Sequence, residues 1–350
     1  MDALSDVLRA VRLTGALFFD VHAGEPWVAE TPAGKAIVGA MFPGSEHLIS
    51  YHVITQGRCW ATVTGEPPIE LVAGDIVILP HGDTHVLSST PGLRRTPDMS
   101  LYRWPEDGQL PISISMGGTQ GEGAQFICGF LGCDAQPFNP LLTALPRAIR
   151  VSDGAGGALG AYVKFALAES KQPRIGGRGV LSRLSELMFV DAVRQYLEGL
   201  PPERTDWLAA LRDPVIGQAL AALHRDAARA WTLESLAREV GLSRTVLAER
   251  FTRFVGHPPM HYLASWRMQL AANHLLSGGD SVAAVAERVG YESEAAFSRA
   301  FKKATGAPPS EWRRQRQAAS ALHAKPDRQL QTVEDGHAID GAGEVVTRTG

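Results

Sequence analysis

One pattern occurs twice in the second half of the chain, and this repeat limits the possible folds more than any other feature. The first copy is LESLAREVGLSRTVLAERFTRFVGHPP, from Leu233, and the second is VAAVAERVGYESEAAFSRAFKKATGAPP, from Val282. Each copy predicts a helix, a turn at a glycine, and a second helix that ends at a glycine and two prolines. Ser243 and Ser293 stand where an N-cap would open the second helix.

A further predicted helix joins the two copies. Residues 260–276, MHYLASWRMQLAANHLL, would span about 25 Å at about 1.5 Å per residue. A helix-turn-helix unit places its second helix in the major groove of DNA, and successive groove segments lie about 34 Å apart. We therefore predict an all-α domain at 205–316 with helix-turn-helix units at about 233–256 and 282–306.

The distribution of charge agrees with a polyanion as the partner of this domain. The whole chain carries 34 Lys and Arg against 37 Asp and Glu. Residues 1–204 hold 16 of the basic and 21 of the acidic residues, whereas residues 205–316 hold 15 and 11. The predicted helical domain is therefore the one positively charged block of the sequence.

The stretch GYESEAAFSRAFKKATGAPPSEWRR, residues 290–314, resembles the signature of the AraC/XylS family of bacterial transcription regulators. The resemblance extends over about 208–316 and implies a domain that binds double-stranded DNA at promoters. It also implies that exposed positions of each second helix contact DNA. In this chain those positions are Arg244, Thr245, Ala248, Glu249, Glu294, Ala295, Ser298, Arg299, Lys302 and Lys303.

These positions differ in what they can contact. Arg299 can donate two parallel hydrogen bonds to guanine, whereas Ala248 and Ala295 can only contact a thymine methyl group. Glu249 and Glu294 can accept hydrogen bonds from cytosine, but they also repel phosphate. The two lysines are expected to contact the phosphate backbone, which positions the protein and makes binding depend on salt. A helical module that binds protein is the alternative.

Residues from about 15 to 150 predict β structure. Short apolar stretches such as HLISYHVIT and DIVILP alternate with Gly, Pro and Asp, as strands joined by tight turns do. No crossover helix separates them, which favours a barrel or a sandwich. A helix predicted at about 181–198 is expected to cap the barrel, to form a dimer interface, or both. The polar, Gly-rich residues 317–350 predict a disordered tail.

A second resemblance lies in the barrel region. The stretch GDIVILPHGDTH fits the second sequence motif of the cupin barrels at Gly74, Pro80, Gly82 and His85. Cupin enzymes hold a metal with three imidazoles and one carboxylate. At the ligand positions of the first motif this chain has Ser50, His52 and Gln56.

The cupin resemblance covers about 10–200, and only two of the family's usual ligands remain, His52 and His85. It implies a cupin-like barrel kept for its pocket, as in the sensor domain of one branch of AraC-like regulators. A cupin metalloenzyme, such as an oxygenase or isomerase with a helical appendage, is the alternative.

Two cysteines offer further metal ligands. Cys128 and Cys133 lie in FICGFLGCD, and with His52 or His85 they would make a tetrahedral zinc site. A spacing of five residues puts them on opposite faces of a regular strand, unless the glycines between them bend it. Buried cysteines that act as small apolar residues are the alternative.

The remaining composition narrows the class of protein. Three cysteines argue against a disulfide framework, and we find no signal peptide and no membrane-spanning window. We therefore predict an α+β multidomain protein of the bacterial cytoplasm, with a cupin-like effector-binding and dimerisation domain at 1–204. It is expected to be a sequence-specific transcription regulator and not an enzyme. A small-molecule effector, a second copy of the chain and RNA polymerase are further expected partners, and zinc is the one cofactor suggested.

Overall fold

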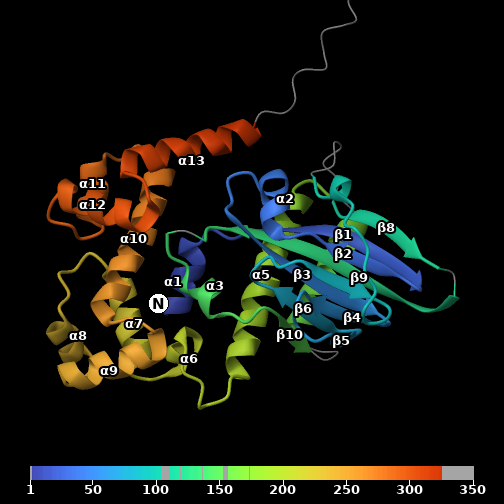
Figure 1. The fold of residues 1–350 in the computed structure, drawn as a ribbon, viewed down its shortest axis with the longest axis horizontal. Coiled ribbons are helices and arrows are strands. Elements are labelled where there is room, and N and C mark those ends of the chain that lie inside the picture. Colours follow the sequence, from blue (N-terminus) through green and yellow to red (C-terminus); the bar gives the residue numbers. More distant parts are fainter. Residues whose placement is uncertain are drawn as a thin grey trace, which may run out of the picture.

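The computed structural model consists of a β-rich domain and a helical domain that lie side by side (Figure 1). It describes residues 2–103, 110–118, 120–135, 137–152, 157–172 and 174–324. Helices α1 (Ala3–Ala10) and α3 (Pro140–Ala144) lie between the two domains. The predicted α+β multidomain fold class is confirmed. Among the described helices, none is long and apolar enough to cross a membrane.

Two sheets form the β-rich domain. One has six strands in the order β10-β6-β3-β9-β1-β8, and the other has four in the order β2-β7-β4-β5. The strands are β1 (Thr14–Glu25), β2 (Val28–Thr31), β3 (His47–Gln56), β4 (Arg58–Val63), β5 (Ile69–Val72), β6 (Asp75–Leu79), β7 (His85–Ser88), β8 (Ile112–Gly117), β9 (Gln120–Cys133) and β10 (Ile149–Ser152). Helix α2 (Gly34–Met41) separates β2 from β3. Alternating side chains fill the space between the sheets, where Phe18, Phe126 and Phe130 are buried.

Helices α4 (Ala158–Lys171) and α5 (Gly177–Glu198) pack together, and α5 lies on the six-stranded sheet. Small residues permit this close approach. A Cβ at Gly15 of β1 would lie 2.5 Å from the Cβ of Ser185 on α5. Tyr51 lies across Gly129, and its hydroxyl donates to Ser185 Oγ at 2.8 Å. The helix predicted at about 181–198 thus begins earlier, at Gly177, and forms the expected cap.

The repeat forms two helix-turn-helix units, as the sequence predicted. The helices of the second domain are α6 (Trp207–Arg212), α7 (Ile216–Arg225), α8 (Leu233–Glu239), α9 (Arg244–Val255), α10 (Pro259–Ser277), α11 (Val282–Arg288), α12 (Glu294–Thr305) and α13 (Pro309–Ala324). Gly241 and Gly290 have φ angles of 70° and 78°, and the side chains of Ser243 and Ser293 accept the expected N-cap hydrogen bonds. Helix α10 joins the first unit, α8–α9, to the second unit, α11–α12 (Figure 1).

Helix α13 continues beyond the predicted end of this domain. The prediction of a disordered tail from 317 is therefore wrong for residues 317–324, which are helical. Their sequence, QAASALHA, is rich in alanine, the residue with the highest helix propensity, and it extends a helix that is already nucleated. Residues 325–350 of the predicted tail lie outside the described residues.

The two units are attached to the barrel in different ways. The first unit shares one continuous apolar core with α1, α5 and the outer face of the six-stranded sheet, whereas the second unit has a core of its own. Polar contacts attach the second unit. Gln269 and Asn273 of α10 donate to the carbonyl oxygen of Ala10 at 3.2 and 2.8 Å. Arg316 of α13 forms an ion pair with Glu46, which precedes β3.

His224 of α7 is buried in the core of the first unit. Its ring stacks on that of Trp266, with centroids 4.1 Å apart, and its Nε2 lies 2.8 Å from the hydroxyl of Tyr262. Burial lowers the pKa of His224 to about 3. The folded chain therefore keeps this imidazole neutral over a pH range in which the unfolded chain protonates it.

We expect acid to destabilise the first unit through His224. Above about pH 6.5 neither state binds a proton there, and below it only the unfolded chain does, down to about pH 3. The free energy of unfolding should fall by about 2 kcal/mol between about pH 6.5 and about pH 5 from this group. The variant His224→Phe keeps a stacked ring that cannot be protonated, so its stability should depend less on pH. Urea titrations followed by tryptophan fluorescence measure this, with the exposed His257→Phe as control. An unchanged pH dependence in His224→Phe would contradict the prediction.

Candidate functional site

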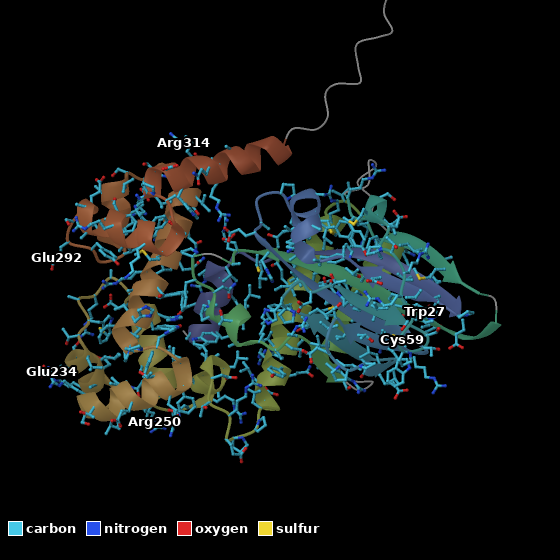
Figure 2. All side chains as sticks on the ribbon, in the orientation of Figure 1. Trp27, Cys59, Glu234, Arg250, Glu292 and Arg314 are labelled. Atoms are coloured by element: carbon cyan, nitrogen blue, oxygen red, sulfur yellow. The ribbon has the colours of Figure 1, made fainter. Side chains whose placement is uncertain are left out.

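Helices α9 and α12 expose the residues predicted to contact DNA. Phe251 and Phe301 anchor the inner face of the two helices and are both 0% exposed, so the opposite faces meet solvent. The exposed predicted residues are Arg244, Thr245, Glu249, Glu294, Ala295, Arg299, Lys302 and Lys303, and the half-buried ones are Ala248 and Ser298. Both units lie on the side of the helical domain away from the barrel, and Glu234 and Glu292 mark their outer edge (Figures 1 and 2).

Some of the cations on these faces are paired with other groups of the protein, and others are not. Within the described residues, the side chains of Arg244, Arg299 and Lys303 make no hydrogen bond or ion pair. Arg250, by contrast, donates to Asp213 at 2.6 Å and holds α9 on the loop before α7. The charges of Arg244, Arg299 and Lys303 therefore remain available for an anionic partner.

Sequence reasoning missed Val246, the residue directly after Thr245 in the run of exposed positions that opens α9. Its side chain is 47% exposed, so it adds an apolar group to this face. Leu247, its neighbour, is fully buried and marks the inner face. Because two adjacent apolar residues of a helix point in different directions, this pair could have identified Val246 as an exposed apolar position.

Arg267 of α10, which the sequence also did not single out, connects the two units. Its guanidinium donates to the carbonyl oxygens of Ala227 at 2.7 Å and Arg229 at 2.8 Å, both in the segment between α7 and α8. It donates as well to the carbonyl oxygen of Gly290 at 3.2 Å, in the turn of the second unit. One planar cation thus links the first unit, the joining helix and the second unit.

In the barrel, the structure brings together three of the predicted metal ligands. Cys128 Sγ lies 3.0 Å from Nδ1 of His52, and Nε2 of His52 lies 2.7 Å from Nε2 of His85. Nδ1 of His85 lies 2.9 Å from the carbonyl oxygen of Asp83. The four groups form a continuous line of hydrogen bonds, which we call the Cys128–Asp83 relay.

One arrangement of protons satisfies the whole relay with neutral groups. The carbonyl oxygen of Asp83 can only accept, so His85 donates from Nδ1 and accepts at Nε2. His52 then donates from Nε2, and its Nδ1 accepts from the thiol of Cys128. Burial favours these neutral forms: it lowers the pKa of His85 to about 4, lowers that of His52 well below its usual value, and raises that of the Cys128 thiol.

The predicted zinc ligands do not fit a metal ion. Cys133 faces the core outside the barrel, whereas Cys128 faces the interior. The pairing of β3 with β9 is unbroken from His52 opposite Cys128 to His47 opposite Cys133, so the glycines do not bend the strand. Gln56 is exposed, and among the described residues no three His, Cys, Asp or Glu side chains could share one ion. Both nitrogens of each imidazole already make a hydrogen bond within the relay.

A cavity of about 210 Å³ lies inside the barrel, and two members of the relay, His52 and Cys128, line it. Its aromatic walls are formed by Phe19, Tyr102, Phe126 and Phe130. The sequence did not identify these four residues as the lining, because which strand positions face inward depends on a register that turn lengths alone did not determine.

The two helix-turn-helix units present unpaired cations, which is typical of a DNA-binding protein. A second domain, the barrel, contains a cavity large enough for a small ligand. Comparisons with known proteins agree. Residues 2–198 match the cupin family, and residues 236–315 match the helix-turn-helix domain family. The chain is 32% identical to a protein of Streptomyces lividans described as an AraC-like transcription regulator, over 90% of this chain and 98% of that protein.

The regulator AlkR of Acinetobacter baylyi is 28% identical over 90% of this chain and 100% of its own length. Among solved structures, the DNA-binding domain of AdpA in complex with a target DNA is 27% identical and covers 29% of this chain and 90% of its own, with a TM-score of 0.28. The chain belongs to the AraC-like family of DNA-binding transcription regulators and carries a cupin domain, as both resemblances in the sequence implied.

The turns of the two units provide a matched test of the junction around Arg267. A Cβ at Gly290 would lie 2.3 Å from the carbonyl oxygen of Ala228, whereas nothing lies within 4 Å of a Cβ at Gly241. Both Gly→Ala changes place a side chain in a left-handed conformation, at about 1–2 kcal/mol. Only Gly290→Ala must also move the two units apart, which should add about 1–3 kcal/mol. Urea unfolding of the two variants measures the difference, and equal losses of stability would show that this contact does not hold the units together.

Proposed function

We propose that the protein binds promoter DNA as a homodimer at a two-part sequence, and that a small effector in the barrel cavity controls this binding. The observation that carries the proposal is the pair of exposed faces on α9 and α12, where Arg244, Arg299 and Lys303 have no hydrogen-bond or ion-pair partner within the described residues. Lysines and arginines without internal partners supply the electrostatic part of DNA binding, and side chains that contact the edges of the bases supply its specificity.

The two parts of the target sequence should differ, because the two helices present different chemistry. Helix α9 offers Thr245, Val246 and Ala248, which suit thymine methyl groups. Helix α12 offers Arg299, which suits guanine, and Lys302 beside it for phosphate. We expect an asymmetric motif with one T-rich part and one part that contains guanine.

Control by an effector requires that the effector bind two arrangements of the domains with different affinity. The cavity lies within the barrel, and the barrel contacts the second unit through polar groups of α10 and α13. Hydrogen bonds and ion pairs at such a contact exchange with water at small net cost. A small change in the barrel can therefore alter the position of the second unit.

The alternative of a cupin metalloenzyme has less support. The Cys128–Asp83 relay leaves no imidazole nitrogen open to bind a metal or to take a proton from a substrate. We propose that the protein acts in the bacterial cytoplasm as a regulator and not as an enzyme. RNA polymerase is the partner that a regulator bound at a promoter would meet.

An exposed apolar surface supports the homodimer. Phe165 of α4 is 50% exposed and Leu187 of α5 is 46% exposed, although the two helices pack together and α5 lies on the sheet. Ala161 and Ala168 flank Phe165 on the same side of α4 and are also exposed. A second copy that covers this face would bury it, and two copies on neighbouring sites would raise the affinity for DNA through effective concentration.

The DNA-binding proposal predicts the outcome of a selection of fragments from the source genome at about 150 mM salt. Enriched fragments should share a motif with two parts about one helical turn apart. The variant Arg299→Ala should bind this motif about 1–3 kcal/mol more weakly, because it loses the paired hydrogen bonds to guanine. The variant Arg58→Ala, at an exposed arginine of β4 in the barrel domain, is the matched control and should bind normally. Binding that is equal for all fragments and unaffected by Arg299→Ala would contradict the proposal.

The dimer proposal predicts that the double variant Phe165→Glu, Leu187→Glu is a monomer. Two carboxylates in an apolar interface are desolvated without partners, which costs several kcal/mol. Light scattering coupled to size-exclusion chromatography measures the mass of the particle. The variant Val72→Glu, at an apolar residue of β5 that is 43% exposed, is the control and should remain a dimer. A dimeric double variant would exclude this surface as the interface.

A further inference from the structure

The walls of the barrel cavity are apolar and aromatic. The rings of Phe19, Tyr102 and Phe130 meet edge to face, with centroids 5.8 to 6.3 Å apart. Ile114 and Met116 of β8 also line the cavity. Rings in this arrangement present faces and hydrogen-rich edges to the cavity, and both are favourable neighbours for another ring.

The inner end of the cavity is formed by His52 and Cys128, the first two members of the relay. Each donor and acceptor of the relay already has a partner inside the protein. Among the described residues, none of the buried side-chain N or O atoms that lack a hydrogen bond lines the cavity. A ligand therefore meets an inner end that offers neither a charge nor a free hydrogen-bonding group.

Three charged residues, Glu30, Arg95 and Asp98, line the cavity, and the two carboxylates already have partners. Glu30 accepts two hydrogen bonds from the guanidinium of Arg94, at 2.9 and 2.5 Å, and one from the backbone N–H of Arg95 at 3.2 Å. Asp98 accepts from the N–H and the hydroxyl of Ser100. At the inner end of the cavity, a carboxylate would lose its hydration without gaining a partner, and a sugar would lose many hydrogen bonds at once.

We propose that the barrel cavity binds an uncharged, single-ring aromatic molecule with no more than a short substituent. The class follows from the aromatic walls and the internally satisfied inner end. The size follows from the volume, since a dry apolar cavity of about 150 Å³ binds benzene and this one measures about 210 Å³. The inference rests on the effector role proposed for the barrel and specifies the chemistry of the effector.

Calorimetric titration of the full-length protein at neutral pH tests the ligand class with three probes of similar size. Toluene should bind with a saturable isotherm. Benzoate, which has the same ring and a negative charge, should bind at least tenfold more weakly, and methylcyclohexane, which has no π system, should also bind more weakly. Benzoate binding as tightly as toluene would overturn the inference, as would an absence of toluene binding up to its solubility limit. Equal affinity for methylcyclohexane would overturn the aromatic class.

Variants locate the binding in this cavity. Ile114→Trp should fill the cavity and weaken toluene binding at least tenfold, whereas Ser113→Trp, one residue earlier on β8 with its side chain exposed on the other face, should not. If Ile114→Trp does not fold, as judged by circular dichroism, Met116→Phe fills less space and should still weaken binding severalfold. A folded cavity variant that binds toluene like the wild type would overturn the assignment to this cavity.

The same samples separate this inference from the proposed function. Toluene binding without any change in DNA affinity would support the ligand class and contradict effector control. A toluene-dependent change in DNA affinity that is lost in Ile114→Trp and kept in Ser113→Trp would support both. A change in DNA affinity caused by benzoate, with none caused by toluene, would overturn the ligand class and leave effector control in place.

Discussion

Arg267 links the two helix-turn-helix units, because its guanidinium donates to backbone carbonyl oxygens on both sides of their junction. Three carbonyl groups converge on this one side chain, from the segment before α8 and from the turn at Gly290. Each would lose a charge-assisted hydrogen bond without it, at about 1.5–3 kcal/mol. A motif in two parts needs a fixed separation between the helices that contact it, and Arg267 adds a direct link between the units to the packing of both against α10. The specificity of the protein for spacing therefore depends on a residue that itself need not touch DNA.

The barrel holds the two units by forces of different kinds. The first unit is continuous with the core under α5 and α1, so separating it from the barrel would expose apolar surface. The second unit has its own core around Phe297 and Phe301 and meets the barrel through Gln269, Asn273 and Arg316. Polar contacts can be replaced by water at little net cost, so the second unit is the part of the DNA-binding domain whose position responds most easily to the barrel.

The sequence predicted the two helix-turn-helix units because the same residues recur at matching positions in both copies. Gly241 matches Gly290, and Phe251 matches Phe301, so each copy supports the assignment of the turn and the buried anchor in the other. The exposed faces of α9 and α12 follow once these anchors are known. For the barrel, the sequence predicted the type of fold but not which residues face its interior. Which strand residues line its cavity depends on pairing over long sequence distances, such as Cys128 opposite His52, and no local pattern fixes that register. Arg267 escaped notice for the same reason, since its three partners lie 23 to 40 residues away.

The residues that make this barrel resemble a metalloenzyme also explain how it can serve a different purpose. His52 and His85 bond to each other, and with Cys128 they satisfy the polar inner end of the cavity, which leaves shape and apolar contact as the means of recognition. An uncharged ligand cannot act on the DNA-binding domain through its charge, so its effect must pass through packing. A contiguous set of rings offers that route. The ring centroid of Phe130 in the cavity wall lies 5.7 Å from that of Phe18, and the centroid of Phe18 lies 6.5 Å from that of Phe42. Phe42 begins the short loop that carries Glu46, the partner of Arg316 on α13. A ring that enters the cavity and displaces Phe130 would therefore act, through close-packed neighbours, on the ion pair that holds the second unit against the barrel.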